Sequence, residues 1–162
     1  MIAIIPDILL LFFPFLMLAF KLFLTQAQTA HKNFAFAYLF ILLICQNFVL
    51  IGDTQVYFSN WQIDTFGIFM REIFTLSALL ALLLSENYFK HSMSEKPRLL
   101  HFSEFAAAIG FATFGGVAVV SANDLLTLFL GLELATIPMY ALVAWNKRDS
   151  EGTEAAIKFI LT

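Results

Sequence analysis

The segment NDLLTLFLGLELATIPMYALVAW, residues 123–145, decides the fold class of this chain. From Leu125 to Trp145 it is apolar almost throughout and carries one acidic or basic side chain, Glu133, close to its middle. About 20 apolar residues, rising about 1.5 Å each, cross a hydrocarbon core of about 30 Å. The segment therefore predicts a membrane-spanning helix with a carboxyl group near its centre.

The composition of the whole chain points the same way. Of its 162 residues, 60% are hydrophobic and 13% are charged, against about 25% charged in a soluble domain. A soluble chain of this length could not shield so many apolar residues from water, so we expect an integral membrane protein. The net charge of −3 gives no sign of a nucleic-acid partner. The single cysteine, Cys45, excludes an intrachain disulfide and a two-cysteine metal motif.

Apolar segments of spanning length recur along the chain. We expect an all-α polytopic bundle over residues 1–162, with about five complete spans, the start of a sixth and no soluble domain. Since the sixth pattern ends without a glycine, proline or polar stop signal, we expect the front part of a longer sequence. The predicted spans are Ile4–Leu24, Phe34–Ile51, Thr65–Phe89, Phe102–Val120 and Leu125–Trp145, and the sixth begins near Glu151.

The distribution of basic residues predicts the orientation. Seven of the nine lie in or beside the loops after the first, third and fifth spans, and the loops after the second and fourth spans have none. Lysine and arginine accumulate on the cytoplasmic or matrix side of a membrane, so the N-terminus is expected on the opposite side. A signal peptide would begin with basic residues, whereas this chain has Asp7 before its first apolar run. The first helix is therefore expected to stay in the mature protein.

Glu133 is the first candidate for chemistry. A charged side chain at the bilayer centre costs about 2.5–3.5 kcal/mol on insertion scales, and is tolerated where it faces protein or a water-filled cavity. A carboxyl group there can pass a proton; in the plainer interpretation it joins two helices as a packing residue. Gly131 allows the backbone of another helix to approach closely. Pro138 leaves one backbone carbonyl without its helical hydrogen bond, and this indicates either a polar path beside the helix or an ordinary kink.

Lys158 is the second candidate. It follows Glu154 by four residues, so the two share a helix face. If the sixth helix continues, Lys158 lies in its first turns, near or inside the membrane, where it is an electrostatic partner for Glu133. The alternative is a lysine at a helix end that extends its ammonium group to the membrane surface.

The other polar residues have simpler interpretations. Asp124 or Asn123 is expected to cap the fifth helix. Glu104 opens the fourth span, and Arg71 and Glu72 lie early in the third. All three are interpreted as anchors at the membrane interface. The histidines form no metal-binding pattern, and no phosphate loop, catalytic triad or cysteine cluster is present, so no cofactor is expected in this chain. The three histidines are His31, His91 and His101.

The motif SANDLLTLFLGLELATIPMYALVAW, followed by EGTEAAIKFIL, resembles a known family. It is similar to the antiporter-like membrane subunits of respiratory complex I, the proton-pumping NADH:quinone oxidoreductase, and most similar to the subunit 2 or N type. The family pattern is an Asn/Asp-headed helix with L-x-L-G-x-E-L, then Pro, Tyr and Ala, then a helix opening E-A-x-x-K-F. The strong match covers 100–162 and a looser one covers 60–100, while 1–60 match in topology only.

The resemblance implies specific roles and partners. Glu133 matches the glutamate that pairs with a lysine, and Lys158 matches the lysine that opens the next helix, both serving proton translocation. FMN, iron–sulfur clusters, NADH and quinone would belong to other subunits. The partners implied are other membrane-arm subunits, lipids and a second polypeptide carrying the remaining helices, since the family is much longer. The location implied is the mitochondrial inner membrane, or alternatively a bacterial plasma membrane, with the N-terminus in the intermembrane space or periplasm.

Two other functions stay open at this point. The chain can be a piece of a multisubunit sodium/proton antiporter, which co-purification without redox subunits would indicate. It can also be a non-catalytic scaffold in which a protonated Glu133 holds helices together. In that case replacing Glu133 with Gln would change neither activity nor pumping.

Overall fold

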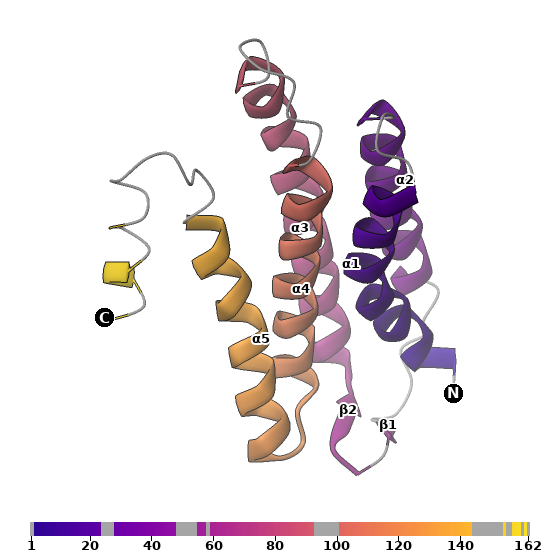
Figure 1. Cartoon of the computed structure of the whole chain (residues 1–162). Coiled ribbons are helices and arrows are strands. Elements are labelled where there is room, and N and C mark those ends of the chain that lie inside the picture. The colour runs from indigo at the N-terminus through magenta and orange to yellow at the C-terminus, as the bar shows by residue number, and fades with distance from the viewer. Residues whose placement is uncertain are drawn as a thin grey trace.

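The computed structural model describes residues 2–23, 28–47, 55–57, 59–92, 101–143, 154, 157–159 and 161. A short 3-10 helix, Ile2–Ile4, leads into the first of five long helices, which lie side by side (Figure 1). A two-stranded hairpin, β1 (Gln55–Tyr57) and β2 (Trp61–Ile63), stands at one end of the bundle between the second and third helices. The helices are α1 (Ile5–Phe23), α2 (Gln28–Asn47), α3 (Thr65–Ser92), α4 (His101–Ser121) and α5 (Leu125–Val143).

The predicted all-α membrane bundle is confirmed, with differences at the ends of the spans. Four described helices, α1, α3, α4 and α5, are long and apolar enough to cross a membrane. The predicted second span, Phe34–Ile51, is not among these four: it falls on α2, which starts at Gln28 with the polar sequence QTAHKN and is described to Asn47. Its last predicted residues, 48–51, and most of the predicted sixth helix lie outside the described part of the chain.

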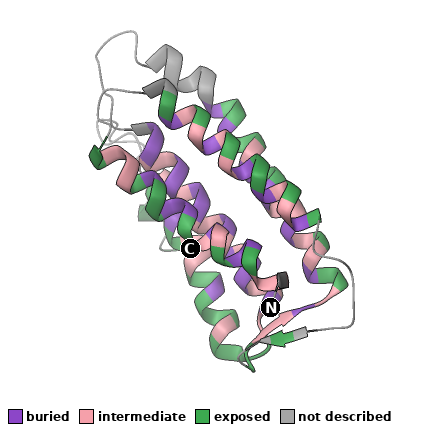
Figure 2. Ribbon diagram, turned by 90° about the vertical axis from the view of Figure 1, so that its right-hand side faces the viewer, coloured by how far each residue is buried: buried purple, intermediate pink, exposed green. Residues whose placement is uncertain are grey.

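Helix α4 occupies the centre of the bundle. It packs against α1, α2, α3 and α5, and half of its spanning segment is buried, compared with 11% for α5. Figure 2 shows buried residues where helices face one another and exposed residues along the outer faces. Buried residues recur at three- and four-residue spacing, as one helix face requires; on α1 these are Leu10, Phe13 and Met17.

Aromatic rings fill the space between α1 and α2. Phe20 stacks on Phe34 with ring centroids 4.4 Å apart, and Phe13 lies 5.4 Å from Tyr38. Pro14 lies inside α1 and lacks an N–H, so it leaves one carbonyl of the preceding turn without a donor. Close to that break, the hydroxyl group of Tyr38 donates a hydrogen bond of 2.7 Å to the Leu9 carbonyl, which joins the two helices.

Glycines bring α4 and α5 into backbone contact. A Cβ atom added at Gly115 would lie 2.3 Å from the backbone nitrogen of Ala135, and one added at Gly131 would lie 2.9 Å from that of Val119. Real Cβ atoms essentially never come within 3.0 Å of such atoms. The small residues therefore determine how closely these two spans pack, as is common between membrane helices.

Replacing Gly115 with Ala should force α4 and α5 apart. We expect destabilisation of about 1–3 kcal/mol, the usual cost of overpacking, seen as a lower melting temperature of the purified protein in detergent. Gly116→Ala is the matched control, because its added methyl would meet only the Phe74 ring at 3.3 Å. Equal effects of the two substitutions would contradict this account.

Asp124 caps the N-terminus of α5. Its Oδ1 accepts a 2.7 Å hydrogen bond from the Thr127 backbone amide and its Oδ2 accepts one of 2.9 Å from the Thr127 hydroxyl. These two hydrogen bonds favour the carboxylate and therefore hold the pKa of Asp124 below its ordinary value, and the bond from the backbone amide has the larger effect. Asn123 instead donates from its side chain to the Ser59 carbonyl at 2.9 Å, which ties the start of α5 to the hairpin.

Removing the cap should loosen the start of α5. We expect Asp124→Ala to lower the melting temperature at neutral pH, and Asp124→Asn to lower it less, because an amide oxygen still accepts from Thr127. The pKa is lower in the folded state, so the carboxylate stabilises fully above the ordinary value of about 3.9. That contribution disappears as pH falls through the lowered folded pKa. Melting curves of wild type and Asp124→Asn should therefore converge in acid; a difference independent of pH would contradict the cap.

Candidate functional site

Glu133 lies in the middle of α5 on the face directed away from the bundle. Its side chain is exposed, whereas Gly131 and Pro138 lie on the opposite, buried face of the helix. Two residues along an α-helix turn the side chain by about 200°, so burial of Gly131 against α4 places Glu133 outward. Among the described residues, none forms an ion pair with the Glu133 carboxylate.

Phe159, in the C-terminal segment, lies against this same side of α5. The Phe159 ring meets the Tyr140 ring edge to face, with centroids 5.3 Å apart. Tyr140 is seven residues after Glu133, which corresponds to the same helix face about 10 Å further along the axis. The neighbour of Phe159, Lys158, forms an ion pair of 2.6 Å with Glu154, and both side chains are largely exposed. The pairing of Lys158 with Glu133 stays a prediction.

Glu104 forms an ion pair at the other end of the bundle from the hairpin. Its Oε1 meets the ammonium group of Lys21, so the end of α1 is joined to the start of α4. The two side chains are 37% and 26% exposed respectively, which leaves the pair partly solvated and weak in energy. Glu72, the other acidic residue interpreted as an anchor, is half-buried on α3.

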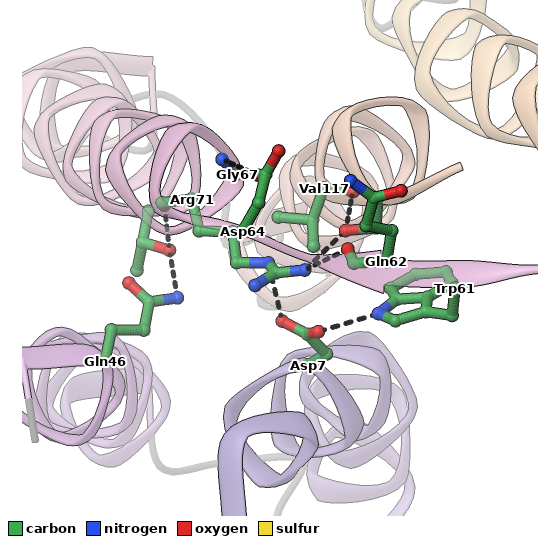
Figure 3. A network of polar contacts seen from close by, with 10 residues as sticks. Asp7, Gln46, Trp61, Gln62, Asp64, Gly67, Arg71 and Val117 are labelled. Carbon is green, nitrogen blue, oxygen red and sulfur yellow. Dashed lines mark hydrogen bonds and ion pairs between the residues drawn. The ribbon is translucent and has the colours of Figure 1, made fainter. Parts of the chain in front are cut away.

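Arg71, interpreted from the sequence as an interface anchor, is buried inside the bundle in the second turn of α3. Its Nε lies 3.2 Å from Oδ1 of Asp7 on α1, and both side chains are less than 5% exposed. Its Nη2 donates a 2.6 Å hydrogen bond to the Ser121 hydroxyl at the end of α4 and approaches the Gln62 carbonyl on β2 at 3.5 Å. The guanidinium group therefore connects α1, α3, α4 and the hairpin (Figure 3).

Further polar groups extend this network by hydrogen bonds. The Trp61 indole donates to Asp7 Oδ2 at 3.0 Å, and the Ser121 hydroxyl donates to the Val117 carbonyl at 2.7 Å. On the α2 side, Gln46 Nε2 donates to the Thr75 hydroxyl at 3.0 Å. Figure 3 shows Asp7 beside Arg71 and Trp61 directed at Asp7, whereas Gln46 approaches from α2 on another side. Two charges in an apolar environment require such partners, because unpaired ions are not tolerated there.

Sequence reasoning missed this network, although a signal was present. Asp7 and Arg71 are opposite charges inside predicted spans, and ionisable residues within spans usually pair with one another. Within the described residues, no three His, Cys, Asp or Glu side chains form a group that could hold a metal ion. The arrangement of the network is that of a charge pair stabilised by a neutral donor to Asp7 and neutral acceptors for Arg71.

Breaking the pair should cost more than replacing it. We expect Arg71→Met alone to destabilise by about 3–5 kcal/mol, because Asp7 would be left as a buried charge without compensation. The double variant Asp7→Leu/Arg71→Met should recover part of that loss, since neither charge remains. Melting temperatures of wild type, both single variants and the double variant give the coupling. Additive losses would contradict a direct pair.

Comparison with known proteins connects the α5 segment to a family of membrane transport proteins. Residues 122–162 match the family described as "NADH:quinone oxidoreductase/Mrp antiporter, TM". The chain is 36% identical over 141 residues to NADH-quinone oxidoreductase subunit N of Heliobacterium modesticaldum, which covers 85% of this chain and 29% of that protein.

Two further relatives have related names. The chain is 34% identical over 124 residues to the chloroplastic NAD(P)H-quinone oxidoreductase subunit 2 of Chlorokybus atmophyticus, covering 74% of this chain and 23% of the relative. It is 38% identical over 111 residues to subunit N of Trichlorobacter lovleyi, covering 68% of this chain and 22% of the relative. The chain thus spans less than a third of the length of these proteins.

Proposed function

The chain belongs to the antiporter-like family of membrane subunits, and we propose that it forms part of a subunit of the N type in a proton-pumping NADH:quinone oxidoreductase. The observation that carries this is the position of the family match, residues 122–162, which includes both Glu133 and Lys158. In this proposal the electron carriers, FMN and iron–sulfur clusters, and the NADH and quinone sites lie on other subunits.

Glu133 is the residue that we propose passes the proton. Its carboxyl group lies at the middle of an apolar span and is exposed on the surface of this chain. A charge facing lipid there would be costly, so the face of α5 that carries it is expected to be covered by protein. Lys158 is the proposed electrostatic partner, and the ring contact between Tyr140 and Phe159 supports a position of its segment along that face.

The remaining helices of the subunit would come from a second polypeptide or a further segment. This chain spans 29% of the Heliobacterium modesticaldum subunit, so its residues supply only part of a proton path. The partners proposed are that polypeptide, neighbouring subunits of the membrane arm and lipids. The proposed location of the chain is an energy-transducing membrane, in which its N-terminus lies on the outer side. The mitochondrial inner membrane stays a prediction, because the relatives compared above are bacterial and chloroplastic proteins.

A part of a sodium/proton antiporter is the second candidate function. The matching family description includes Mrp antiporters as well as NADH:quinone oxidoreductases. Native-gel separation of gently solubilised membranes distinguishes the two, since only the first predicts migration with NADH dehydrogenase activity. A scaffold in which Glu133 joins two helices of this same chain is not favoured, because Glu133 faces away from α4.

Replacing Glu133 with Gln tests the proton role. We expect assembly to persist and NADH-driven proton pumping in inverted vesicles to fall several-fold, because Gln cannot exchange a proton; Glu133→Asp should retain part of the pumping. Glu72→Gln, at a half-buried glutamate of α3, is the matched control and should pump normally. Full pumping by Glu133→Gln would remove the basis of the proposal.

A further inference from the structure

A small pocket separates two parts of the buried polar network. It holds about 10 Å³ of water-accessible space between α1, α2 and α3, and its lining includes Asp7, Gln46 and Arg71 with three apolar residues, Ala3, Pro6 and Ile68. All three polar side chains are deeply buried: Asp7 is 3% exposed, Gln46 3% and Arg71 2%. The pocket therefore lies between the side-chain amide of Gln46 on α2 and the ion pair that Asp7 of α1 forms with Arg71 of α3.

Each polar side chain that lines the pocket has an atom without a hydrogen-bond partner among the described residues. These atoms are Asp7 Oδ1, Gln46 Oε1 and Arg71 Nε. Asp7 Oδ1 and Arg71 Nε are 3.2 Å apart and attract as ions, but their alignment does not make a hydrogen bond. Two acceptors and one donor thus remain around one small space, and buried polar atoms in native proteins are rarely left in this state.

The orientation of the Gln46 amide is determined by its neighbour. The Thr75 hydroxyl donates its proton to the Arg71 carbonyl at 2.9 Å, so it can only accept from Gln46. The amide nitrogen of Gln46 therefore points to Thr75, and its oxygen is the atom left over. Rotating the amide by 180° would place two acceptors against each other, so it does not satisfy the missing bond.

We propose that this pocket binds one water molecule. The water donates to Gln46 Oε1 and Asp7 Oδ1 and accepts from Arg71 Nε. About 10–15 Å³ of such space and two to four polar partners are what a buried water needs, and both conditions are met. With the water in place, the side chain of Gln46 is joined directly to the Asp7–Arg71 pair, and side-chain hydrogen bonds run from α2 through the pair to Trp61 of the hairpin.

A cation is disfavoured at this position. The Arg71 guanidinium group lines the pocket and already balances the charge of Asp7. Two side-chain oxygens are also far fewer than the six to eight oxygen ligands that a bound Ca²⁺ takes. An empty pocket is disfavoured too, because the cavities that stay dry are lined by apolar groups. A neutral molecule that both donates and accepts is the occupant that fits.

A density map of the membrane assembly purified through this chain, at a resolution that shows ordered water, tests the proposal. We expect one peak within about 2.7–3.2 Å of both Gln46 Oε1 and Asp7 Oδ1. Gln46→Met, which keeps the length of the side chain but removes its acceptor, should lose the peak and lower the melting temperature. Ser121→Ala is the control: it removes a partner of Arg71 that does not line the pocket, so the peak should stay.

The wild-type map alone can overturn the proposal, even if a variant fails to assemble. Well-defined side chains with no peak between them would do so, as would a direct hydrogen bond from Arg71 to Gln46. A peak at shorter distances, about 2.3–2.6 Å, that disappears when cations are removed would indicate a bound ion instead. These outcomes do not depend on whether the assembly pumps protons, so they are separate from the test at Glu133.

Discussion

The buried ion pair between Asp7 and Arg71 is the constraint on which the hairpin end of the bundle depends. Neither charge is stable alone in an apolar environment, and each is held where neutral groups of other elements supply hydrogen bonds. The Trp61 indole and the Ser121 hydroxyl come from the hairpin and the end of α4, so the pair determines where these elements lie. The two-stranded hairpin, which would be only marginally stable by itself, is thus held against the membrane bundle.

The rest of the bundle is held by contacts of two kinds. Large rings fill the interface of α1 with α2, where Phe20 stacks on Phe34. Small residues form the interface of α4 with α5, where glycines allow the backbones to touch. At the end opposite the hairpin, the solvated Lys21–Glu104 pair joins α1 to α4. The two ends of α1 are therefore both fixed by charge, the hairpin end by a buried pair and the other by a partly exposed one.

The helices were predictable from the sequence, and most of the buried network was not. Length and apolarity identify α1, α3, α4 and α5, because crossing a membrane imposes both. The hairpin was missed, since three-residue strands have no periodic signal long enough to recognise. Asp7 and Arg71 were visible as charges inside spans, but their pairing joins residues far apart in the chain, and spacing cannot reveal it. For Glu133, the sequence predicted a mid-span carboxyl group, whereas its outward direction follows from the packing of Gly131.

The backbone contact between α4 and α5 has a mechanical consequence. Because Gly131 and Gly115 leave no room for a side chain, rotating α5 about its axis would drive Leu132 or Leu134 into the backbone of α4. The rotation of α5 about its axis is therefore restricted, and the Glu133 carboxyl group stays on the face of α5 directed away from α4. Changes in its surroundings have to come from its own χ angles, from water, or from whatever helix lies against the open face.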